Sequence, residues 1–151
     1  MPERTFGGPY VQAATLCQVA ITDNQNALSL IRLQDRIQVQ GTTERMRPQP
    51  LFNYTLVVVL KAGEMRGTAM LRITPITPSG RSLEHADVNV LFEGDERGVV
   101  LQAPLGVIAE EEGLYWVEVT LDGTLLTRIP FRVLYQQVAI PPGFPMPPTA
   151  G

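Results

Sequence analysis

A hairpin predicted over residues 113–134 constrains the fold of this chain most strongly. Asp122-Gly123 stands between two stretches in which polar and apolar residues alternate. The dipeptide suits the two positive-φ positions of a type I′ turn, whose twist matches that of paired strands. Alternation with a period of two indicates strands with one buried and one wetter face. The side chains expected inside are Tyr115, Val117, Val119 and Leu121 on the first arm and Ile129, Phe131 and Val133 on the second.

The entry to this hairpin, Glu111-x-Gly113-x-Tyr115, has two interpretations. One is a tyrosine corner, in which a strand tyrosine ties its hydroxyl back to the preceding loop, as in immunoglobulin-like sandwiches. The other is a glycine turn followed by an ordinary strand tyrosine. The second arm contains Pro130, which has no N–H for a ladder, so this part of the strand is expected at an edge or a bulge.

Other extended segments are separated by turn residues. The β-branched, apolar run that ends the segment 52–60 predicts a central strand covered on both sides. Pro75 predicts an edge or bulge in the segment 68–77. We expect a loop at 61–67 and a turn at 94–98. The remaining predicted strands are 13–22, 27–33, 37–40, 82–93 and 99–109, and 13–33 is expected to form a hairpin.

Short strands at this spacing, without helical periodicity, predict an all-β fold. We expect an antiparallel, immunoglobulin-like two-sheet sandwich of about seven to nine strands. A chain of 151 residues suits a single domain with a real core. The expected organisation is an N-terminal arm (1–12), a β-sandwich domain (13–137) and a proline-rich C-terminal arm (138–151).

Composition narrows the function classes. With 12 basic and 15 acidic residues and no basic stripe, the chain is not expected to bind nucleic acid. No apolar run approaches the ~20 residues of a spanning helix, and no signal peptide is visible, so we expect a cytoplasmic protein without membrane contact. Cys17 is the single cysteine, which excludes an intrachain disulfide, and it is expected to fill the core.

Six short patterns occur between residues 28 and 133. They are Leu28-Ser29-Leu30-Ile31, Asp35-Arg36-Ile37, Pro78-Ser79-Gly80, Gly113-x-Tyr115, Asp122-Gly123 and Pro130-Phe131-x-Val133. These patterns resemble those of a group of small, uncharacterised bacterial β-sandwich proteins. The likeness covers roughly residues 13–134 and departs from the group at Gln25-Asn26 and Arg32. It implies the sandwich fold and no activity.

The residues that carry enzyme chemistry are sparse. His85 is the only histidine, stands among polar residues and is expected to be exposed. The acidic run 110–112 is expected to be a solvated surface. Asp87, Asp95 and Glu96, or the acidic run 110–112, are candidate calcium ligands, but the stretch 94–98 lacks the alternating ligand pattern and its Arg97 would repel the ion. We therefore expect no enzyme, no metal and no cofactor.

The function expected from the sequence is a non-enzymatic binding or assembly module, including a homo-oligomer subunit that uses its terminal arms. A proline-dense segment favours polyproline II and can dock in a groove of another subunit or partner, although a loose tail is the plainer interpretation. The alternative is a small-ligand or carbohydrate-binding domain that uses Trp116, Tyr54 or Tyr135 as stacking platforms. The candidate partner-binding residues are Pro142, Phe144, Pro145, Met146, Pro147 and Pro130.

Overall fold

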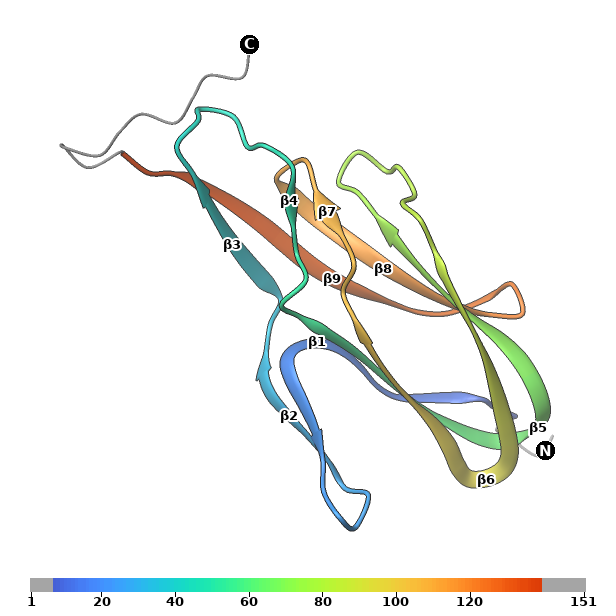
Figure 1. The fold of residues 1–151 in the computed structure, drawn as a ribbon. Coiled ribbons are helices and arrows are strands. Elements are labelled where there is room, and N and C mark those ends of the chain that lie inside the picture. The colour runs from blue at the N-terminus through green and yellow to red at the C-terminus, as the bar shows by residue number, and fades with distance from the viewer. Residues whose placement is uncertain (1–6, 140–151) are drawn as a thin grey trace, which may run out of the picture.

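The computed structural model describes residues 7–139, which form an all-β fold of nine strands (Figure 1). This part of the chain contains no helix long and apolar enough to cross a bilayer. The strands are β1 (Tyr10–Thr22), β2 (Leu28–Leu33), β3 (Arg36–Gly41), β4 (Gln49–Pro50), β5 (Thr55–Ile76), β6 (Ala86–Pro104), β7 (Ile108–Ala109), β8 (Gly113–Leu121) and β9 (Thr124–Gln137).

The longest elements are β5 and β6, which lie side by side and bend together, at the lower right of Figure 1. The predicted loop 61–67 and the predicted turn 94–98 were wrong, since both stretches belong to these continuous strands. The ladder shifts register at Lys61/Gly63 and at Gly63/Arg66, so bulges absorb the bend. Hydrogen bonds to the facing strand, rather than local turn chemistry, decide the structure of both stretches.

The bend gives the two halves of β5 different neighbours around one core. The first half pairs with β1 and the second half pairs with β8, while β6 follows both halves. The ladder is therefore one seven-stranded sheet, ordered β2-β1-β5-β8-β9-β3 with β6 beside β5, plus the small β4–β7 pair. Side chains from both halves, such as Leu56, Val58, Leu71 and Ile73, share a single buried cluster.

The ladder between β3 and β9 differs from the all-antiparallel expectation, because these strands run parallel. The two-residue link Gln34-Asp35 carries the chain from β2, at one end of the sheet, to β3 at the other end. The N–H of Arg132 donates to the carbonyl of Asp35 over 2.8 Å just before the parallel ladder starts. The strands are far apart in sequence, so no tight turn requires them to be antiparallel.

The central-strand prediction for 52–60 is confirmed within β5, which begins at Thr55. Val57 and Val58 point to opposite faces, and both are completely buried. Pro130 lies before the β3–β9 ladder, which starts at Arg132, so its stretch of β9 has a ladder on one side only. Pro75 lies just past the β5–β6 ladder, which ends at Ile73, but the N–H of Leu83 still donates to the Pro75 carbonyl over 2.8 Å. Neither proline interrupts a ladder.

The predicted hairpin is confirmed as β8–β9. Asp122 and Gly123 have φ values of 47° and 85°, as a type I′ turn requires. The carboxylate of Asp122 also accepts a 2.8 Å hydrogen bond from the N–H of Met70, which fastens the turn to β5. Inside, Tyr115 stacks on its cross-strand partner Phe131, with ring centroids 5.1 Å apart.

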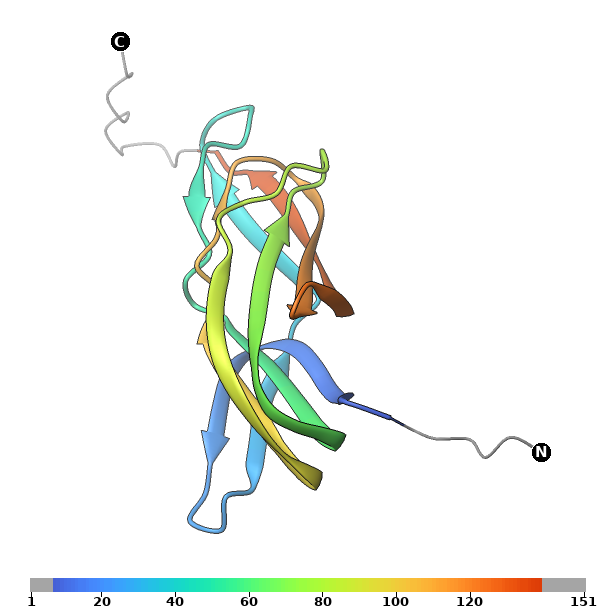
Figure 2. The ribbon, with the colours of Figure 1, turned by 90° about the vertical axis from the view of Figure 1, so that its right-hand side faces the viewer.

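The β1–β2 hairpin packs on the outer face of the sheet, the face that is turned away from the buried cluster. The turn of the hairpin projects at the lower end of both views (Figures 1 and 2). The amide of Gln102, on β6, donates to the hydroxyl of Thr22 over 3.3 Å. Leu28 and Leu30 line a shallow groove with Val59 of β5. One side of the hairpin therefore packs on the sheet, which leaves the other side turned outward.

Candidate functional site

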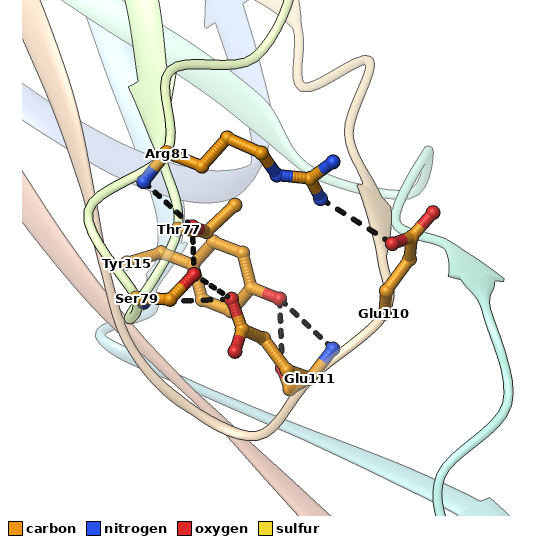
Figure 3. Close-up of polar contacts among 6 residues, drawn as sticks. All are labelled: Thr77, Ser79, Arg81, Glu110, Glu111 and Tyr115. Atoms are coloured by element: carbon orange, nitrogen blue, oxygen red, sulfur yellow. Dashed lines mark hydrogen bonds and ion pairs between the residues drawn. The ribbon is translucent and has the colours of Figure 1, made fainter.

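The loop before β8 is held by a tyrosine corner (Figure 3). The buried hydroxyl of Tyr115 donates to the carbonyl of Glu111 over 2.7 Å and accepts from the N–H of the same residue over 3.4 Å. Burial raises the pKa of this phenol. The first interpretation of the Gly113-x-Tyr115 entry is thus the one that the structure bears out.

Each carboxylate of the acidic run 110–112 contacts a neighbouring segment. Glu110 forms an ion pair with Arg81 at 3.3 Å, and Glu111 accepts a 2.9 Å hydrogen bond from the hydroxyl of Ser79 (Figure 3). Glu112 accepts a 2.7 Å bond from the N–H of Tyr135. The three side chains diverge to three partners, so they fasten the loop and do not converge on a substrate-sized space.

His85 is exposed, as expected, and lies beside an ion pair that joins β5 to β6. The guanidinium of Arg72 donates twice to the carboxylate of Asp87, at 2.7 and 3.0 Å, and Nε2 of His85 is 3.7 Å from the same carboxylate. The hydrogen bond from Arg72 is the main cause of a lowered pKa at Asp87. This cluster is a cross-strand surface contact.

The residues considered for calcium do not meet in the structure. Asp87 is engaged by Arg72, while Asp95 lies at the bend of β6, 3.8 Å from Arg66. Within residues 7–139, no group of three or more His, Cys, Asp or Glu side chains is arranged to hold a metal ion. A cleft lined by His85 and Glu84 is otherwise walled mostly by apolar residues such as Leu105 and Val107.

The three candidate stacking aromatics are all half-buried. Trp116 lies on the outer face of the sheet, with Ile76 of β5 and Pro130 of β9 as its register partners. The hydroxyl of Tyr135 donates to the carbonyl of Thr43 and so anchors the loop after β3, whereas Tyr54 packs against the core. Because none of the three is buried completely, they leave the ligand-binding alternative open.

Cys17 is fully buried, as expected for a residue that fills the core, although it is not part of the largest buried cluster. It is the register partner of Thr55 on β5 and of Leu33 on β2. Burial raises the pKa of its thiol, which disfavours the reactive thiolate. Cys17 is therefore a buried residue at the base of the β1–β2 hairpin.

The outward side of the β1–β2 hairpin carries a row of uncovered side chains, Val19, Ile21 and Ile31, called here the aliphatic face. Val19 lies opposite Ile31 in the ladder, and Ile21 follows two residues later, so all three point to one side. Their exposed fractions are 43%, 47% and 44%, and Leu33 at the end of β2 reaches 64%. The sequence analysis did not predict this surface. Its signal was that apolar residues occupy both faces of the strands at 19–21 and 28–31.

Pro130 is the one predicted partner-binding residue that the structure describes. It lines a shallow hollow of about 340 Å³ together with Leu33, Gln34 and Asp35, so it lies near the end of β2. The other predicted partner-binding residues belong to the C-terminal arm and lie outside the described residues. They are Pro142, Phe144, Pro145, Met146 and Pro147.

Comparison with known proteins places most of the chain in a protein family. Residues 12–134 match a family described as a family of unknown function, DUF6941. Among solved structures, the chain is similar to the crystal structure of an immunoglobulin-like protein from Pseudomonas aeruginosa, with 12% identity and a TM-score of 0.43. That match covers 84% of this chain and 97% of the other. No curated protein matches the chain.

Proposed function

The chain belongs to the DUF6941 family, whose function is unknown, and we propose that it is a non-enzymatic binding or assembly module. The observation that carries this proposal is the aliphatic face of the β1–β2 hairpin. Three β-branched side chains stand on one side of a projecting hairpin, each more than two-fifths exposed. Neighbouring exposed apolar side chains that form a patch mark interaction surfaces more often than isolated ones do.

The carboxylates of the run 110–112 and of Asp87 support the same role, because each is engaged in a structural contact. The carboxylates of the run 110–112 bind the loop to its neighbours, and Asp87 is held by Arg72. An enzyme of the acid–base type needs such groups directed together at a substrate. Here they stabilise contacts between strands and loops.

The proposal includes an immunoglobulin-like sandwich with two terminal arms. The two halves of the bent sheet act as the two layers, and the shared core around Leu56 and Leu71 supports this view. The residues that precede β1 and residues 138–151 act as arms in a cytoplasmic assembly, whereas residues 10–12, expected in the N-terminal arm, belong to β1. In this scheme the C-terminal arm docks Phe144 and Met146 in a groove of a neighbouring subunit.

Light scattering over a range of concentrations tests the assembly role, with the full chain compared with a chain that ends at Ala139. This truncation keeps every residue of the described fold. The full chain should gain mass with concentration, and the shorter chain should assemble less if the arm contributes. If the full and the shorter chain are both monomeric at all concentrations and equally stable, self-assembly and the docking role of the C-terminal arm are both contradicted.

A small-ligand or carbohydrate-binding role is the second candidate. Trp116 favours it, since this half-buried indole lies between Ile76 and Pro130 on the outer face of the sheet. It is the only tryptophan, so its fluorescence reports on this place alone. A saturable change on titration with soluble oligosaccharides would support the second role over the first. A constant spectrum would remove Trp116 as the binding platform.

A further inference from the structure

We propose that the free edge of β2 pairs with the β2 edge of a second copy of this chain, in antiparallel orientation, so that the two aliphatic faces form one continuous surface. This inference rests on the proposed assembly function and names its partner and its contact. The pairing would extend the seven-stranded sheet of each copy across a two-fold axis. Such an interface is closed, since the same patch is used on both sides.

The first support is the position of β2. It is the terminal strand of the sheet, and within residues 7–139 no strand pairs with its outer edge. An edge strand presents unpaired N–H and C=O groups that serve as a template for another strand. Proteins usually protect such an edge with lysine, proline or inward charges. The strand Leu28–Leu33 has no lysine or proline and carries a single charge, Arg32.

The other outermost strands of the sheet, β6 and β3, are less suited to pairing. β6 carries Glu93, Asp95, Glu96 and Arg97 at its bend, where the bulges also break the register. β3 is approached by Gln49, whose amide donates to the carbonyl of Gln40 over 3.1 Å. Of these three outermost strands, β2 is the least protected.

The second support is the register that the strand itself allows. Arg32 has a φ of 57°, so the regular part of β2 is Leu28–Ile31. Pairing centred on Leu30 puts Ile31 opposite the second copy's Ser29, and the reverse. In the β1–β2 ladder of each copy, Val19 is opposite Ile31 and Ile21 is opposite Ser29. A row across the two copies therefore runs from Val19 and Ile31 of one copy to Ser29 and Ile21 of the other.

Charge is compatible with this register. Arg32 would lie opposite the second copy's Leu28, so the only charges of the two strands do not face each other. Like charges directly opposite would destabilise a ladder. A second copy can therefore pair with the backbone edge of β2, continue the aliphatic face and avoid a repulsion between like charges. No other protein is needed to fill these roles.

Cysteine cross-linking tests the partner and the register together. In an antiparallel pair, opposite Cα atoms are about 4.5–5.5 Å apart, within the range that a disulfide spans. A mixture of Ser29→Cys and Ile31→Cys chains should oxidise to a mixed dimer much faster than either variant alone. Leu91→Cys, on β6 with 56% exposure, is the matched control for random collision. A mixed dimer that forms no faster than the Leu91→Cys dimer would overturn the inference.

Ile31→Lys separates this inference from the proposed function. We expect the variant to lose the concentration-dependent mass of the wild type, while Leu91→Lys keeps it. If the wild type assembles and Ile31→Lys assembles equally well, the β2 contact is wrong and the assembly function stands. If the wild type is monomeric at every concentration, the inference fails together with self-assembly. The cysteine pair remains decisive if Ile31→Lys does not fold.

Discussion

The hydroxyl of Tyr115 donates to the carbonyl of Glu111 over 2.7 Å and thereby closes the loop that enters β8. The ring of the same residue stacks on Phe131, at the centre of the β8–β9 hairpin. One side chain therefore connects the core of the hairpin to the acidic run beside it. This contact explains why residues that resemble an active-site cluster in the sequence act as structural fasteners.

Replacing Tyr115 by phenylalanine should destabilise the fold by about 1–2 kcal/mol, because the ring stays packed while the Glu111 carbonyl loses its partner. Urea unfolding measures the change. Tyr54→Phe is the matched control, since no hydrogen bond of the Tyr54 hydroxyl is found among the described residues. Equal stability of Tyr115→Phe and wild type would contradict the role of the corner.

Alkaline pH should destabilise the wild type more than Tyr115→Phe. Burial raises the pKa of Tyr115 in the folded chain, so the folded state keeps the phenol proton where the unfolded state loses it. This contribution is complete below the unfolded pKa of about 10 and is lost as pH rises through the folded value. Melting temperatures measured between neutral pH and pH 11 test this prediction. Melting temperatures that fall equally with pH for both chains would refute it.

Acid should weaken the contact between β5 and β6 at Asp87. Its pKa is lowered chiefly by the hydrogen bond from Arg72, so its contribution is present above the unfolded pKa and is lost as pH falls through the folded value. Asp87→Asn should therefore flatten the fall in melting temperature below about pH 4. Glu96→Gln, which removes an exposed carboxylate with no ion pair among the described residues, controls for net charge. The effect is small, because the pair is exposed.

Gly98→Ala should destabilise the fold by about 3 kcal/mol or more, because the close approach of β6 to β5 leaves no room for a methyl group. A Cβ atom at Gly98 would lie 1.8 Å from the carbonyl oxygen of Leu60. Gly106→Ala is the matched control, since a Cβ atom there meets nothing within 4 Å. Chemical denaturation compares the two variants. Similar midpoints would contradict the prediction, because they would show that β5 and β6 can move apart at Gly98 with little loss of stability.

Much of this fold follows from local sequence, and the β8–β9 hairpin is the clearest case. Asp122-Gly123 determines the turn, and the alternation that begins at Tyr115 determines which side is buried. Pro130 also predicted the one-sided stretch of β9 in which it lies. These features depend on backbone conformation and on a period of two, both of which are visible over a few residues.

The rest depends on contacts between distant residues. Gly63 and Gly67 made 61–67 look like a loop, yet the ladder with β6 carries the strand through this bulged stretch. The fold of the β1–β2 hairpin over Val59 and Gln102 is equally non-local. Since apolar residues occur on both sides of that hairpin, the sequence alone did not show which side the sheet would cover. The aliphatic face follows from that arrangement.

Hydrogen exchange of the full chain at increasing concentration tests the β2 contact most directly, because it reports protection residue by residue. Backbone amides at the outer edge of Leu28–Ile31 should become protected as the concentration rises, in proportion to the dimer formed. Amides of β6 near Leu91 should keep their exchange rates. Unchanged exchange in β2 while the mass rises, or new protection along β6 instead, would contradict the β2 contact.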